Sequence, residues 1–137
     1  MTTPLHMRMI GPALLVLAGC AAAESPELAC QQRLIAAGRT AEPAADQAKA
    51  DPFNNLAYAA LDRTGCTARQ SAAIERLVAI TAALPALMSD NERLSHSRDD
   101  AVQMAAFQRM NDALIETNAL TRGAQADLDR MLANGPR

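Results

Sequence analysis

The chain has 137 residues, which is the length of one small domain with a single hydrophobic core and argues against a multidomain enzyme. Half of the residues are hydrophobic, but the aromatic ones are only Phe53, Tyr58 and Phe107. The core is therefore expected to consist of Leu, Ile, Val, Met and Ala, a mixture that favours helices over strands. The formal net charge is −2 with both signs interspersed, so no nucleic acid partner is expected.

The N-terminal region has the pattern of an export signal. Arg8 supplies a basic flank, and residues 9–18 form an apolar stretch. That stretch is about half as long as the roughly 20 residues that a membrane-spanning helix needs. Translation can start at Met1 or at Met7, because the sequence from Met7 is a complete signal by itself. Both starts predict the same mature protein.

The apolar stretch ends in four residues that resemble the lipobox of bacterial lipoproteins: Leu17, Ala18, Gly19 and Cys20. The resemblance implies that a signal peptide of residues 1–19 is removed and that Cys20 receives a diacylglycerol thioether and an N-acyl group such as palmitate. At about 0.8 kcal/mol per buried CH₂, such an anchor is effectively permanent. The alternative is an ordinary signal peptide that is cut near residues 21–23 and leaves Cys20 without a role.

The same resemblance predicts where the mature protein is located. Ala21 follows the cysteine where an inner-membrane lipoprotein of the enterobacterial type has Asp, so the outer membrane, on its periplasmic face, is expected rather than the inner membrane. Residues 20–25 then form the lipidated cysteine and a short tether, of which residues 21–25 span at most about 18 Å. Residues 26–137 are expected to form a single helical domain close to the membrane.

The first helix of this domain is predicted over residues 26–37. Ser25 is a candidate N-cap, Pro26 suits the first helical position, and Gly38 is a typical stop. Residues 39–51 are polar and rich in Ala and carry no apolar stripe, so they are expected to form a connection.

A second helix is predicted over residues 52–64, after the Asp51 cap and before Gly65. Its expected apolar face consists of Phe53, Leu56, Ala57, Ala60 and Leu61.

A third helix is predicted over residues 68–88, with Thr67 as its cap and Pro85 as a kink or an end. Its expected apolar side consists of Ile74, Leu77, Val78, Ala82, Leu84 and Met88.

The last helix has two candidate starts, because residues 89–92 and residues 97–100 both resemble a capping box. Apolar residues then recur at spacings near three and four up to Asn134, where Gly135 and Pro136 end the pattern. A helix of about 35 residues is some 50 Å long. Gly123 costs about 1 kcal/mol in a helix and is a candidate break. The expected fold is all-α, a small bundle of about four helices with a long C-terminal helix.

With Cys20 acylated, Cys30 and Cys66 remain as a pair in an oxidising compartment. This predicts a structural disulfide that closes a loop of about 37 residues and contributes about 3–4 kcal/mol in the chain-entropy model. A redox-active pair is more typically a close CxxC, and a zinc site needs further ligands that the sequence does not offer.

Catalytic patterns are not recognisable in the sequence. His96 has no second histidine or free cysteine to join it, so it is interpreted as a solvated residue. Asp99 and Asp100 are explained as charges in the first turn of a helix. No enzyme activity, cofactor or metal is therefore expected.

One segment of about 12 residues resembles the helix motif of OmpA-like peptidoglycan-binding domains, in which an arginine holds a diaminopimelate carboxylate. The agreeing positions are Asn91, Leu94, Ser95, Arg98 and Val102. Asp99 departs from the motif, and the strand that precedes it in that family is not predicted here. A chance match to a helix start is the competing interpretation.

These observations favour a non-catalytic interaction module that presents a groove or helix face to an unidentified envelope protein. In architecture alone, small helical lipoproteins with a disulfide resemble the pilotins that escort secretin subunits. The alternatives are a self-associating coiled-coil lipoprotein, through the long last helix, and a pilotin-like or peptidoglycan-associated accessory protein.

Overall fold

Four α-helices connected by turns make up the part of the chain that the structure, a computed structural model, describes: residues 24–39 and 51–135. The helices are α1 (Pro26–Gly38), α3 (Asn55–Ala59), α4 (Ala68–Leu94) and α5 (Asp100–Asn134). The expected all-α fold with a long C-terminal helix is confirmed. The predicted export signal, Cys20 and most of the predicted connection lie outside the described residues.

Helix α1 begins and ends close to where the sequence predicts. The Ser25 hydroxyl accepts a hydrogen bond of 3.1 Å from the Leu28 amide, and Pro26 occupies the first turn, where no amide donor is needed. The helix includes Gly38, one residue beyond the prediction, and the Arg39 amide closes it by donating to carbonyls of the last turn.

The predicted helix over residues 52–64 is wrong in extent, because α3 has only five residues. At its start, the Asp51 carboxylate accepts hydrogen bonds of 2.8 Å from the Asn55 and Leu56 amides, and Asn54 adopts a left-handed conformation with φ 57°. These side-chain to main-chain bonds replace the first helical turn. The expected apolar face is also wrong in part: Leu56 is 67% exposed, and Tyr58 is the buried side chain of α3.

Helix α4 starts as predicted and ends six residues later than predicted. Thr67 and Gln70 form a complete capping box with bonds of 3.2 and 2.9 Å. Pro85 lies inside the helix without ending it. A proline in a helix interior costs about 3 kcal/mol, and burial of Leu84 and Leu87 on either side of it offsets that cost. The candidate start at residues 89–92 therefore lies within α4.

Among the described residues, α4 is also long and apolar enough to cross a membrane, judged by length and composition. The core helix of a soluble protein meets the same criterion. Ile74, Leu77 and Leu84 on α4 are completely or almost completely buried against the other helices. These contacts make α4 the central helix of the bundle.

The N-cap of helix α5 lies two residues after Ser97, the second candidate cap. Asp99 rather than Ser97 is the N-cap, since its carboxylate accepts from the Ala101 and Val102 amides, while the Ser97 hydroxyl accepts from the Asp99 amide. The 35 residues of α5 are uninterrupted at Gly123 and span about 52 Å at 1.5 Å per residue.

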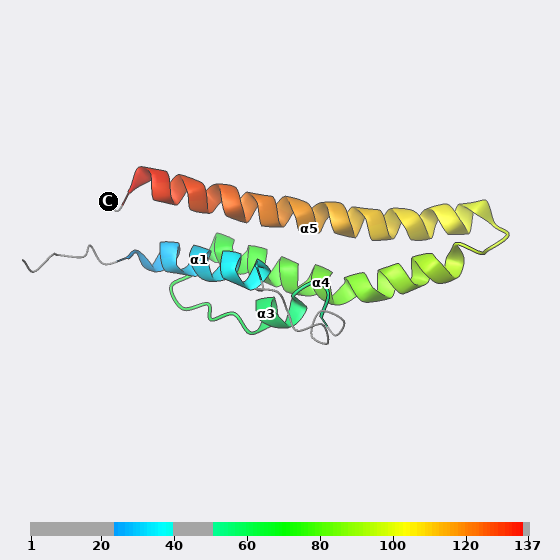
Figure 1. Cartoon of the computed structure of the whole chain (residues 1–137), viewed down its shortest axis with the longest axis horizontal. Helices are drawn as coiled ribbons and strands as arrows, with labels where there is room; N and C mark the ends of the chain where they lie inside the picture. Colours follow the sequence, from blue (N-terminus) through cyan, green and yellow to red (C-terminus); the bar gives the residue numbers. More distant parts are fainter. Residues whose placement is uncertain (1–23, 40–50, 136–137) are drawn as a thin grey trace, which may run out of the picture.

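Helices α4 and α5 form an antiparallel hairpin, and α1 lies along the half of it that contains the end of α5 (Figure 1). The short α3 packs against α4 and α1. One core cluster joins the four helices through Cys30, Leu34, Tyr58, Ile74, Leu77 and Ala124. Beyond α1 and α3, the end of α4 and the start of α5 continue as two helices alone.

Candidate functional site

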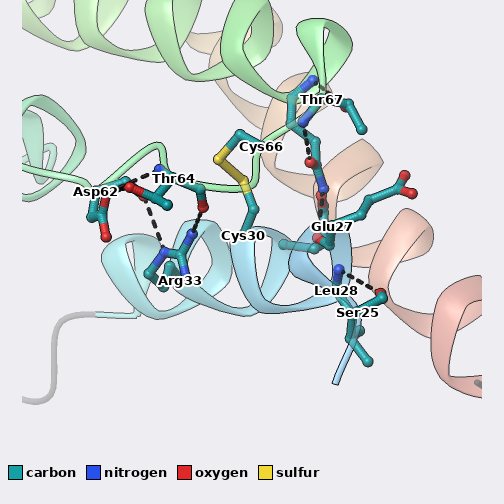
Figure 2. The surroundings of a disulfide bond; sticks show 11 residues. Ser25, Glu27, Leu28, Cys30, Arg33, Asp62, Thr64, Cys66 and Thr67 are labelled. Atoms are coloured by element: carbon teal, nitrogen blue, oxygen red, sulfur yellow. Dashed lines mark hydrogen bonds between the residues drawn. A yellow bond between two sulfur atoms is a disulfide. The ribbon is translucent and has the colours of Figure 1, made fainter. Parts of the chain in front are cut away.

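The predicted disulfide between Cys30 and Cys66 is present. It joins the completely buried Cys30 of α1 to the residue that precedes the cap of α4, with the two Cα atoms 5.2 Å apart (Figure 2). The two cysteines are separated by 36 positions in the sequence. The bond therefore fixes α1 to the beginning of α4, which is the structural role expected of it.

A set of hydrogen bonds holds the loop beside the disulfide (Figure 2). The Arg33 guanidinium donates to the main-chain oxygens of Asp62, at 3.0 Å, and of Thr64. The Thr64 hydroxyl and amide both donate to the Asp62 carboxylate, at 2.7 and 2.9 Å. These bonds, with a smaller contribution from the Arg33 charge, hold the pKa of Asp62 below its usual value. The loop is thus held against α1 by hydrogen bonds as well as by the disulfide.

A buried amide network joins three helices next to the disulfide. Gln31 of α1 donates 2.7 Å to the Ala124 carbonyl of α5, and Gln70 of α4 donates 2.8 Å to the Gln31 side-chain oxygen. Gln70 also donates 3.0 Å to the Glu27 carbonyl. Gln31 and Gln70 are 2% and 6% exposed, so each bond forms away from bulk water.

No prediction from the sequence included this network, although the sequence contains a usable signal for it. Gln70 stands four positions before Ile74 and seven before Leu77, which is the spacing of one helix face. Gln31 likewise stands three positions before Leu34. A polar residue in an apolar stripe is a candidate for buried hydrogen bonding.

A groove of about 540 Å³ runs between α1, α4 and α5 beside this network. Small residues such as Ala73, Ala119 and Gly123 contribute to its lining. Across it, Arg69 of α4 lies 3.4 Å from the Asp127 carboxylate of α5. The other charged side chains that line the groove are Glu27, Glu116 and Arg130.

The five residues that resemble a peptidoglycan-binding motif do not lie on one helix. The last turn of α4 contains Asn91 and Leu94, and Ser95 is its C-cap. Arg98 lies in the turn between the helices, and Val102 lies in the first turn of α5. The motif to which they are similar lies on a single helix, so the geometry gives the resemblance no support.

The other polar residues singled out in the sequence lie around the same turn. His96 is exposed between the helices, and Asp99 and Asp100 occupy the cap and first turn of α5, as their helix-start interpretation requires. Within residues 24–39 and 51–135, no group of three His, Cys, Asp or Glu side chains is arranged to hold a metal ion.

Several large apolar side chains are exposed on the last turns of α4 and the first half of α5. They are Met88, Val102, Met104, Phe107 and Ile115, which we call the hairpin surface. Phe107 is 49% exposed and Met104 is 56% exposed. Close by, Pro52, Phe53, Pro85 and Met110 line a depression of about 500 Å³ with Met88. Large apolar side chains that are exposed over a contiguous surface typically mark contact with another macromolecule.

Comparisons of the chain with known protein families, with curated proteins and with solved structures find no match. The fold defines the class: an all-α bundle with a disulfide between its first helix and the start of its central helix.

Proposed function

We propose that this protein is a lipid-anchored interaction module of the cell envelope, without catalytic activity, that binds another envelope protein through the hairpin surface. The lipobox resemblance at Cys20 supports the anchor and the location at the periplasmic face of the outer membrane. The observation that carries the interaction is the set of exposed large apolar side chains on the last turns of α4 and the first half of α5.

The positions of the two ends of the bundle agree with this proposal. Helix α1 begins at the end of the bundle where α5 finishes, and the turn between α4 and α5 lies at the opposite end (Figure 1). A short tether that ends at Ser25 would hold the first of these ends near the bilayer. The hairpin surface would then lie on the side away from the membrane, accessible to a periplasmic domain of a partner.

Crosslinking in cells tests the interaction. A photoreactive amino acid at position 104 or 107 should capture a specific envelope protein, and Met104→Ser with Phe107→Ser should abolish co-purification of that protein. Leu132→Ser is the matched control, because Leu132 is also 56% exposed but lies near the end of α5. Loss of the partner with Leu132→Ser and not with the double variant would contradict the proposal.

Metabolic labelling tests the anchor separately. The wild-type chain should incorporate palmitate and fractionate with the outer membrane, whereas Cys20→Ser should remain unlabelled and soluble in the periplasm. An unlabelled wild-type protein would overturn the lipoprotein assignment. It would not affect the crosslinking result, which tests the interaction independently of the anchor.

Self-association is the second candidate, because the same exposed side chains on α5 could pack against a second copy. The crosslinking experiment distinguishes the two: a dimer of the chain itself supports self-association, and a different protein supports the module. Sedimentation over a range of concentrations checks the first outcome.

A further inference from the structure

A pocket separate from the hairpin surface lies where all four described helices meet. Its volume is about 240 Å³, and its apolar walls come from Leu34 and Ile35 of α1, Leu77 of α4 and Ala124 of α5. An apolar cavity of about 150 Å³ is large enough to bind benzene, so this pocket has room for a somewhat larger apolar group.

The Tyr58 side chain contributes a hydroxyl to this pocket. Tyr58 is 3% exposed as a residue and contributes to the lining of the pocket. Gly38 makes room for it: a Cβ atom at that position would lie 2.7 Å from the hydroxyl oxygen. Burial raises the pKa of Tyr58, so the hydroxyl keeps its proton and is a donor. A protonated hydroxyl in the lining of a pocket is a donor to which a ligand oxygen can bind.

The charged groups around the pocket have one sign. Arg39 and Arg122 line it, and none of its described lining residues is acidic. Arg39 is held in place by a hydrogen bond of 2.8 Å from its guanidinium to the Gln125 side-chain oxygen. The carbonyl end of α1 carries partial negative charge beside these residues and repels an anion. An anion that binds here therefore needs both guanidinium groups to offset that repulsion.

From these observations we infer that this pocket binds a carboxylate attached to a short apolar group. The apolar group lies against Leu34, Ile35 and Leu77, and the acceptor oxygens take hydrogen bonds from Tyr58 and the two arginines. Two sources offer this chemistry: a free short-chain acid, and the C-terminal residue of a peptide. The site is inferred independently of the membrane anchor and of the hairpin surface.

The protein carries its own probe for the test, because Tyr58 is the single tyrosine and the chain has no tryptophan. Titration of the purified, oxidised protein with octanoate and with N-acetyl-leucine should change the tyrosine fluorescence saturably. The neutral analogues octanamide and N-acetyl-leucinamide should bind at least about fivefold more weakly, as expected for loss of a charge-assisted hydrogen bond. Saturation with octanoate alone indicates a free acid, and saturation with N-acetyl-leucine alone indicates a peptide end.

Variants followed by calorimetry test the residues. Tyr58→Phe keeps the packing and should weaken binding of the acid about fivefold, and Arg39→Gln or Arg122→Gln should remove the preference for acid over amide. Arg109→Gln, outside the pocket, is the control. Circular dichroism checks that each variant is folded. The inference is overturned if neither acid binds saturably, or if folded Tyr58, Arg39 and Arg122 variants bind like the wild type. Either result leaves the proposed function intact, since crosslinking at the hairpin surface does not depend on this pocket.

Discussion

The side-chain amide of Gln31 donates a hydrogen bond of 2.7 Å to the main-chain oxygen of Ala124, 93 positions further along the chain. This bond connects α1 and α5 in the core. Gln70 of α4 donates a second hydrogen bond to the Gln31 side-chain oxygen. Three helices therefore share one amide network, whose two glutamine side chains are almost completely buried.

Replacement of Gln31 by Ala should lower the free energy of unfolding by about 2 kcal/mol, because the Ala124 carbonyl and the Gln70 amide lose a buried partner. Gln32→Ala is the matched control, since Gln32 is the exposed neighbour on the same helix and should change stability by less than about 0.5 kcal/mol. Urea unfolding of both variants measures the difference, and equal effects would contradict the importance of the network.

Gly123→Ala should raise the free energy of unfolding by about 1 kcal/mol. Gly123 lies inside α5, and a Cβ atom built there meets nothing within 4 Å, so alanine gains helix propensity without a clash. Gly38→Ala should instead destabilise, because its Cβ atom would approach the hydroxyl of the buried Tyr58. Thermal unfolding checks the pair, and the opposite order of melting temperatures would refute this account.

Removal of the disulfide by the double change Cys30→Ala and Cys66→Ala should cost about 3–4 kcal/mol, the chain-entropy value for a loop closed over 36 positions. Reduced wild-type protein should show a similar loss in guanidinium unfolding. Unchanged stability in both samples would mean that the hydrogen bonds of Arg33 hold the loop without the covalent bond.

Stability should also depend on pH through Glu116. The hydrogen bond from Arg76 lowers the pKa of Glu116 in the folded state, and a second bond of the same pair measures 2.7 Å. A lowered pKa means that this contribution is present above the unfolded value, about 4.3, and is lost as the pH falls through the folded pKa. Wild-type protein should therefore exceed Glu116→Gln in stability at pH 7, and the gap should close in acid. Arg76→Gln should give the same profile, and a gap independent of pH would exclude the ion pair as its cause.

The sequence predicts the helices best where the capping signals are local and unopposed. Ser25 with Pro26, and Thr67 with Gln70, begin helices in the structure as the pattern indicates. Such caps depend on residues within one turn of each other, so they are readable without knowledge of the fold. The cysteine pair was predictable for a different reason: the lipobox resemblance assigns Cys20 to lipid, and the two remaining cysteines allow one pairing.

The failures occur where contacts distant in sequence decide the outcome. The segment after α3 is not helical because Arg33, some 30 positions earlier, binds its carbonyl groups. Helix α4 continues through Pro85 because its flanking leucines are buried by other elements. The exposure of the hairpin surface could not be predicted either. The apolar spacing of α5 does not reveal how far α1 extends along that helix.

The disulfide also determines how a mechanical load on the N-terminus would travel through the molecule. A pull on Ser25 reaches Cys30 after little more than one turn of α1 and passes through the sulfur bridge to Cys66 at the beginning of α4. The residues between the two cysteines form a loop that carries no tension. A protein tethered at this end would therefore bear force on its central helix, while α3 stays unloaded.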